Sequence, residues 1–227
     1  MKWREVIKDN KNIVFVGESG CGKTELALNC AVELGKSCEN VTLIDMDQTK
    51  SVFRSRDFAE ELAAKNVALL CGEKFLDTPV VPPGVERLLK DKDSINVLDV
   101  GGNETGALTM GQFARQLQST DHIVYFVINP FRIFSLNEKH ISDMKERIKA
   151  YGRFVEFKLV ANPNLGQNTQ WEDIIEGISR LKEIFDDSDD APAFITLEET
   201  MKPYAEKNPK ELENQKIIYI KKYLQYP

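Results

Sequence analysis

The sequence predicts an α/β protein with three layers, in which helices cover both faces of a mostly parallel central sheet. Short, entirely apolar runs recur along the chain, and longer amphipathic segments separate them. Such runs are typical of strands buried on both faces, with the segments between them forming the covering helices. The 227 residues, of which 42% are hydrophobic, are enough for one such core. We therefore expect a single domain over residues 1–227.

The expected strands are short runs rich in Val, Ile, Leu and Phe. They lie at residues 13–16, 41–45, 67–70, 95–100, 123–128 and 154–160, and a less regular run lies at 193–197. Because helical patterns separate most of these runs, neighbouring strands should be parallel.

Helices are expected where apolar residues recur every three or four positions, at residues 24–34, 133–151 and 171–185. A short helix at 85–90 should follow the loop 77–84, which is rich in Pro and contains Gly. The acidic run 186–190 should be a solvated turn. Residues 198–227 mix lysines, glutamates and tyrosines, and we expect a C-terminal extension packed on the domain as a surface helix. Its end, residues 216–227, should dock on the core as a helix or strand.

Composition and charge argue against some classes of partner. The formal net charge of −6 disfavours a general affinity for nucleic acid or anionic membranes. The N-terminus has no apolar signal-peptide core, and no run approaches the roughly 20 apolar residues of a membrane span. We expect a cytoplasmic protein whose partners are a nucleotide and another protein, not nucleic acid or membrane. The four cysteines show no C-x-x-C spacing, so no local zinc or redox motif is present.

The most specific motif follows the first expected strand. It consists of Gly17, Glu18, Ser19, Gly20, Cys21, Gly22, Lys23 and Thr24. It matches the G-x-x-x-x-G-K-[S/T] pattern of a phosphate-binding loop, and it lies between a strand and a helix, as that pattern requires. Its glycines allow backbone N–H groups to approach phosphate oxygens, and the helix N-terminus adds a positive dipole end. The sequence thus predicts a nucleotide site on a P-loop NTPase fold.

Three side chains of this loop have separate predicted roles. Lys23 should reach the β- and γ-phosphates, and the Thr24 hydroxyl should be a ligand of Mg²⁺. Cys21 is expected to be a small filler whose backbone contacts phosphate. The alternative is a redox-sensitive thiol, because a helix N-terminus lowers the pKa of a thiol.

Two other expected strands carry carboxylates at their ends. Asp45 ends the second strand and Asp47 follows it, and Asp99 lies at the end of the fourth, just before Gly101 and Gly102. The carboxyl ends of parallel strands meet at the edge where open α/β folds bind ligands. Asp99 fits the role of holding Mg²⁺, while the two glycines offer backbone N–H groups to the γ-phosphate. Loss of that phosphate would release the loop 101–106, an order-to-disorder switch.

The succession GESGCGKTELALN, LIDMDQT and VLDVGG resembles the MinD/ParA group (CobQ/CobB/MinD/ParA nucleotide-binding family) of the SIMIBI class of P-loop NTPases. This class includes nitrogenase iron protein, the arsenical-pump ATPase and nickel-insertion ATPases. The resemblance covers about residues 11–165. It implies that Asp47 orients the attacking water, that Asp45 assists at Mg²⁺, and that a homodimer can close around two ATP molecules.

The chain departs from the family pattern at Glu18. Many members carry a signature lysine there, which reaches the phosphates of the partner subunit. An acid would repel those phosphates, so hydrolysis should be slow or should depend on another basic residue. Arg54, Arg56 and Arg115 are the candidates.

Asn162 stands where relatives place an asparagine against adenine, and its amide offers the donor and the acceptor that adenine needs. The alternative is a turn built by the Asn-Pro pair. In the related GTPases an Asn-Lys-x-Asp run recognises guanine, whereas this chain has Asn-Pro-Asn-Leu at residues 162–165. The resemblance therefore favours ATP.

The leading hypothesis is a Mg²⁺-dependent ATP-binding protein and slow ATPase, whose γ-phosphate state switches a dimer or a partner interaction. One alternative is a small-molecule kinase or amide ligase, which would release little phosphate until a metabolite is added. Another is a nucleotide sensor without hydrolysis, which Glu18 favours.

Overall fold

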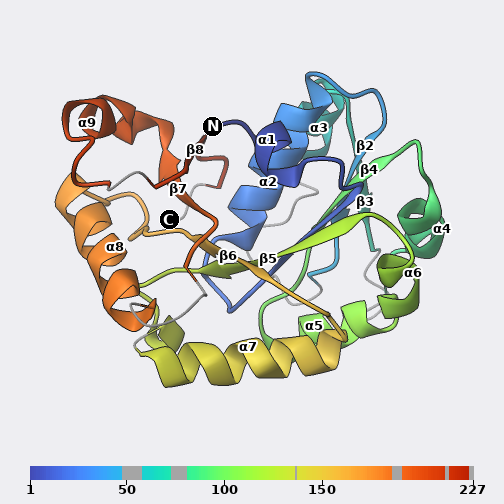
Figure 1. Cartoon of the computed structure of the whole chain (residues 1–227). Helices are drawn as coiled ribbons and strands as arrows, with labels where there is room; N and C mark the ends of the chain where they lie inside the picture. The colour runs from blue at the N-terminus through green and yellow to red at the C-terminus, as the bar shows by residue number, and fades with distance from the viewer. Residues whose placement is uncertain (48–57, 73–80, 136, 186–190, 213–214, 225–227) are drawn as a thin grey trace.

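The computed structural model describes residues 1–47, 58–72, 81–135, 137–185, 191–212 and 215–224. The expected acidic turn at 186–190, Arg54 and Arg56 lie outside these ranges, as does the first half of the loop 77–84. Within them, the chain forms a central sheet with helices on both sides (Figure 1), which is the predicted three-layer arrangement.

The sheet has eight strands, and every pair of neighbours is parallel. In chain order the strands are β1 (Asn12–Val16), β2 (Val41–Asp45), β3 (Val67–Cys71), β4 (Ile95–Asp99), β5 (His122–Ile128), β6 (Lys158–Ala161), β7 (Phe194–Glu198) and β8 (Ile217–Ile220). Their spatial order is β3-β2-β4-β1-β5-β6-β7-β8. The order changes direction around β1, and in open α/β sheets ligands bind at the carboxyl edge of such a point.

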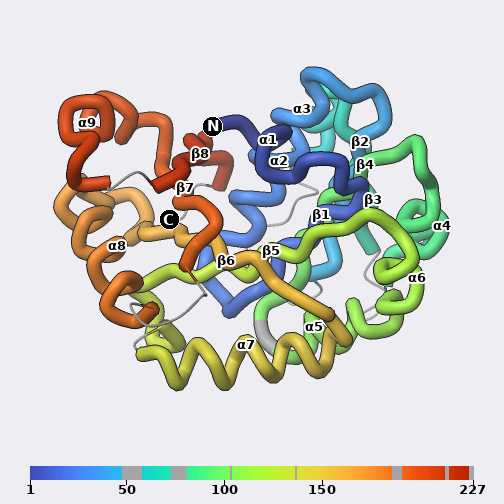
Figure 2. Tube along the Cα trace, in the orientation of Figure 1, coloured from blue at the N-terminus to red at the C-terminus, as the bar shows by residue number. Residues whose placement is uncertain are grey.

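Helices of the first part of the chain cover one face of the sheet, and the later helices cover the other. The first group is α1 (Trp3–Ile7), α2 (Lys23–Gly35) and α3 (Ala59–Ala63). The second group is α4 (Val85–Lys90), α5 (Asn103–Gly111), α6 (Ala114–Gln118), α7 (Glu138–Gly152) and α8 (Trp171–Phe185), with α9 (Lys202–Lys207) beyond β7. Figure 2 shows the two groups as separate layers around the strands.

The alternation of side chains along β1 explains why its sequence is apolar throughout. Ile13 and Phe15 belong to the core under α2, whereas Val14 and Val16 belong to the core on the opposite face. A parallel strand covered on both faces buries every position, and all five residues of β1 are buried.

The first core also fixes the N-terminus through aromatic contacts. Trp3 is 1% exposed and meets the rings of Phe15 and Phe194 edge to face, with centroids 5.7 and 5.6 Å apart. These contacts explain the five-residue helix α1, which has no helical repeat of its own.

Two expected boundaries are wrong. Strand β6 begins at Lys158 and not at residue 154, because Phe154 lies in the turn that ends α7 and fills the core from there. Helix α7 begins at Glu138 and not at residue 133, because Asn137 caps it by accepting a hydrogen bond from His140 N at 2.9 Å.

The C-terminal segment adds more than a surface helix. After α9, strand β8 pairs in parallel with β7, so the segment extends the sheet by one strand. Within the described part of the chain, no helix is long and apolar enough to cross a membrane.

Candidate nucleotide-binding site

The phosphate loop connects β1 to α2 and lies at the carboxyl edge of the sheet, as predicted. Gly17, Gly20 and Gly22 all have positive φ angles, which side chains rarely adopt. At Gly22 a β-carbon would also collide with Nδ2 of Asn162. Glycine is therefore required at the last turn before the helix.

Lys23 is folded over this loop. Its side chain is buried, with 5% of the residue exposed, and Nζ donates a hydrogen bond to the carbonyl of Glu18 at 2.7 Å. The sulfur of Cys21 lies 3.9 Å from the same nitrogen. The ammonium group is thus held above the loop backbone, where a phosphate group would bind.

A threonine and an aspartate from distant parts of the sequence meet beside the loop. The hydroxyl of Thr24 donates to Oδ2 of Asp99 at 2.7 Å, and Asp99 is 0% exposed. Asp45 stands level with Asp99 on the neighbouring strand, because the two residues are paired in the β2–β4 register. The structure therefore brings Thr24, Asp45 and Asp99 to one point at the carboxyl edge.

Asp47 and the glycine pair complete this edge. The backbone N–H of Asp47 donates to Oδ1 of Asp45 at 3.0 Å, and its carboxylate lies over Gly101. A β-carbon at Gly102 would lie 2.7 Å from the backbone nitrogen of Ser19, so this turn touches the phosphate loop. Because α5 begins at residue 103, the expected loop 101–106 is reduced to the glycine pair followed by a helix.

The carboxylates do not form a metal cage of their own. Among the described residues, no group of three or more His, Cys, Asp and Glu side chains could hold a metal ion. Thr24 and Asp99 nevertheless supply the hard oxygen atoms that Mg²⁺ prefers, and Mg²⁺ usually takes its other ligands from water and phosphate. The residues present therefore fit a Mg²⁺ ion bound together with a nucleotide.

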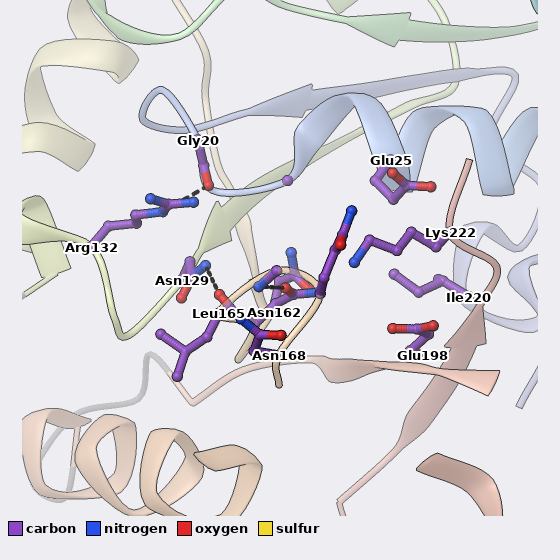
Figure 3. A pocket seen from close by; sticks show the side chains of 14 residues that line it. Gly20, Glu25, Asn129, Arg132, Asn162, Leu165, Asn168, Glu198, Ile220 and Lys222 are labelled. Atoms are coloured by element: carbon purple, nitrogen blue, oxygen red, sulfur yellow. Dashed lines mark hydrogen bonds between the residues drawn. The ribbon is translucent and has the colours of Figure 1, made fainter. Parts of the chain in front are cut away.

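A cavity of about 380 Å³ adjoins the loop. Its walls are Gly20 and Gly22, the segment 164–168 after β6, and the ends of β7 and β8 (Figure 3). This volume falls in the range of small-molecule sites. The polar groups of the segment after β6, among them Asn164 and Asn168, face a space of the right size for a base and its sugar.

Asn162 braces the loop from inside the protein. It is 4% exposed, its Nδ2 donates to the carbonyl of Cys21 at 2.9 Å, and its Oδ1 accepts from the hydroxyl of Thr196 at 2.9 Å. The amide group that the sequence suggests for adenine is thus already used at both ends by protein groups. A run of Asn and Gln after β6 is the signal in the sequence that could have pointed to Asn164 and Asn168 instead.

The basic residue that reaches the loop is Arg132, which the sequence did not single out. Its Nε donates to the carbonyl of Gly20 at 3.0 Å (Figure 3). Arg115 lies on α6, which leads into the amino end of β5 and so to the opposite edge of the sheet. Glu18 is half-buried, and its carboxylate accepts a hydrogen bond from Ser19 N at 3.2 Å.

Cys21 behaves as a filler. The residue is 2% exposed, and its burial raises the pKa of the thiol although Lys23 nearby lowers it. A buried thiol that stays protonated reacts slowly with oxidants. The geometry supports the filler interpretation over the redox alternative.

Comparisons with known proteins agree with this geometry. The model of the CobQ/CobB/MinD/ParA nucleotide-binding domain matches residues 13–168, which is more than half of the chain. No functionally curated protein sequence matches.

Similar solved structures include the BceF tyrosine kinase domain, with 18% identity and a TM-score of 0.42 over 70% of this chain and 72% of that one. FlhF complexed with GTP and Mg²⁺ has 16% identity and a TM-score of 0.45 over 73% of this chain and 59% of that one. The signal recognition particle receptor FtsY from Elizabethkingia anophelis has 13% identity and a TM-score of 0.39 over 85% and 50%. The chain thus spans less than two thirds of FlhF and FtsY. The match of the family model shows that the chain belongs to the CobQ/CobB/MinD/ParA nucleotide-binding domain family.

Proposed function

We propose that this protein is a Mg²⁺-dependent ATP-binding switch with slow hydrolysis, acting as a single domain. The contact of 2.7 Å between the Thr24 hydroxyl and Asp99 carries the proposal. It joins the residue after the phosphate-loop lysine to the acid at the end of β4, and this pairing is what a nucleotide-bound Mg²⁺ requires. When bound, the ion would neutralise charge on the β- and γ-phosphates.

Lys23 would exchange one acceptor for another on binding. Its ammonium group now bonds to a neutral carbonyl of Glu18. A phosphate oxygen is a stronger acceptor for a charged donor, since charge-assisted hydrogen bonds are shorter and stronger than bonds to neutral groups. We therefore expect the side chain to turn from Glu18 to the phosphates.

The glycine pair would report the γ-phosphate. Gly102 already touches Ser19 of the loop, so a phosphate group bound there would contact the turn that begins α5. Helix α5 carries Leu108, which is 57% exposed, and it is tied to α7 by the ion pair Glu104–Arg147 at 3.0 Å. A change at the turn would thus move an exposed apolar residue, which suits a switched contact with a protein partner or a second copy.

Slow hydrolysis rests on Glu18 and Arg132. Glu18 puts a negative charge where many members of the family carry a signature lysine. Arg132 supplies a positive charge at the loop from within the same chain, through its bond to Gly20. We propose that Asp47 orients the attacking water, since its carboxylate lies beside the glycine pair. The sensor without hydrolysis is the second candidate, and the acid at Glu18 is the observation that favours it.

Calorimetry with ATP, in the presence and absence of Mg²⁺, tests the binding part of the proposal. We expect binding that requires Mg²⁺ and is lost in Lys23→Ala. GTP titrated in parallel tests the preference for adenine. A wild-type protein that binds neither nucleotide would overturn the proposed function.

Phosphate release tests the catalytic part. A slow release without any added metabolite supports the ATPase, and its loss in Asp47→Ala assigns the water-orienting role. Release only after a metabolite is added would favour the kinase or ligase alternative. Binding without release would favour the sensor. Light scattering with and without ATP then shows whether a dimer forms, and we expect partners among cytoplasmic proteins, not nucleic acids or membranes.

A further inference from the structure

The chain segment after β8 is held by two side chains of the helix that begins at the phosphate loop. We call residues 221–224 the C-terminal strap. Asn29 binds Lys221 twice, accepting from its N–H at 2.7 Å and donating to its carbonyl at 2.7 Å. One turn earlier, the carboxylate of Glu25 accepts from the N–H groups of Tyr223 and Leu224, the latter at 3.1 Å.

These bonds attach the backbone of the strap to side chains of α2. Glu25 follows Lys23 and Thr24 directly, so the strap is anchored one residue beyond the expected ligands of phosphate and Mg²⁺. The buried side chain of Leu224, 3% exposed, adds an apolar contact at the end of the strap. The position of the strap is therefore coupled to the position of the nucleotide helix.

The anchored strap presents Lys222 to the cavity beside the phosphate loop. Lys222 is half-buried, and Figure 3 shows its amine pointing into the cavity, toward the segment after β6. Within the described part of the chain, this amine forms neither a hydrogen bond nor an ion pair within 4 Å. Glu25 and Glu198 line the same cavity, but the carboxylate of Glu25 is already bonded to the strap backbone.

Electrostatics agree with this placement. Burial raises the pKa of Glu25, the strap N–H groups and the charge of Lys222 lower it, and the charge of Glu198 raises it. Lys222, Glu25 and Glu198 line the same cavity, so all three charges face the start of α2 (Figure 3). The half-buried ammonium group of Lys222 can attract an anionic ligand in this cavity, against the opposing charge of Glu198.

We propose that the C-terminal strap is part of the nucleotide site and that Lys222 is an additional cation for the bound nucleotide, alongside Lys23 and Arg132. This inference rests on the proposed function, since it assumes that the cavity holds the nucleotide. Lys23 would bind the phosphates at the β1 side of the site, and Lys222 would bind from the side of β8. The ligand class is a purine nucleotide, whose phosphate charge or polar sugar would contact the ammonium group of Lys222.

Nucleotide affinity of three variants tests the role of Lys222. Lys222→Ala should weaken the binding of Mg²⁺–ATP about tenfold, the effect of about one charge-assisted hydrogen bond. Lys222→Arg keeps the cation and should stay within about threefold of the wild type. Lys216→Ala is the matched control, because it removes the same charge from an exposed position just before β8, outside the strap and the cavity lining. It should bind as the wild type does.

A second measurement follows the strap itself. Hydrogen exchange of the amides of residues 221–224 should slow when Mg²⁺–ATP binds, and this slowing should be absent in Lys222→Ala. A wild type that binds nucleotide, with Lys23→Ala defective and Lys222→Ala unchanged in affinity and exchange, would refute this inference and leave the proposed function standing. A wild type that binds no nucleotide would overturn both.

Discussion

Replacing Asn162 separates a structural role from a role in base recognition. Asn162→Ala removes the donor to the Cys21 carbonyl and the acceptor for the Thr196 hydroxyl, at a position 4% exposed. Each hydrogen bond contributes about 1 kcal/mol, and a buried partner left unsatisfied costs about 1–3 kcal/mol. We therefore expect a loss of about 2–4 kcal/mol in the free energy of unfolding. For a chain of this size that corresponds to a fall in Tm of roughly 5–15 °C.

The affinity for nucleotides gives the second half of this test. If Asn162 braces the loop, the variant should lose affinity for ATP and GTP by similar factors, because both share the phosphates. Urea unfolding measures the loss of stability, provided that the m-value is unchanged, and calorimetry with each nucleotide measures the loss of affinity. Asn168→Ala is the control: Asn168 is exposed and lines the cavity, so stability should change by less than about 0.5 kcal/mol. An Asn162→Ala variant of normal stability that lost ATP binding alone would refute the bracing role.

Three other outcomes follow from the geometry. Thr24→Val keeps the shape but removes the hydroxyl bonded to Asp99, so the Mg²⁺-dependent part of nucleotide affinity should fall at least about tenfold in calorimetry. The folded pKa of Glu25 is raised above its ordinary value of 4.5, so its contribution to stability is present below pH 4.5 and is lost as the pH rises through the folded pKa. In Glu25→Gln, urea midpoints measured from pH 4.5 upward should fall less with pH than in the wild type. The same fall with pH in both proteins would contradict the assignment. A thiol-specific alkylating agent should label the partly exposed Cys38 of the native protein and leave Cys21 unlabelled, which mass spectrometry can check.

The parallel sheet could be predicted because its strands are buried on both faces, and burial of every position leaves a continuous apolar run. The strand β1 is the clearest case, with alternate side chains in the two cores. The same signal misleads at Phe154, since an apolar side chain can enter the core from a turn as well as from a strand. A helix of five residues such as α1 is too short to show a repeat, and the contacts of Trp3 with distant rings that stabilise it leave no local signal in the sequence.

The phosphate loop could be predicted because its residues are adjacent in the sequence. The residues that support it are not. Arg132 is 112 positions away from Gly20, and no local pattern distinguishes it from an ordinary surface arginine. Asn162 and Asn168 are the same residue type in one segment. Only the structure distinguishes them, because Asn162 is bonded to Thr196 and braces the loop, whereas Asn168 lines the cavity.

The bonds to the loop explain how a flexible glycine-rich turn can bind phosphate without a large loss of entropy. Two side chains from other parts of the chain hold consecutive loop carbonyls, Arg132 at Gly20 and Asn162 at Cys21. In a planar trans peptide the N–H of the next residue points away from the carbonyl, so the N–H groups of Cys21 and Gly22 point away from Arg132 and Asn162. The carbonyl of Glu18 accepts from Lys23 at 2.7 Å and from the N–H of Cys21 at 3.4 Å. A phosphate group would take over both donors at once, and the loop would need little rearrangement to receive it.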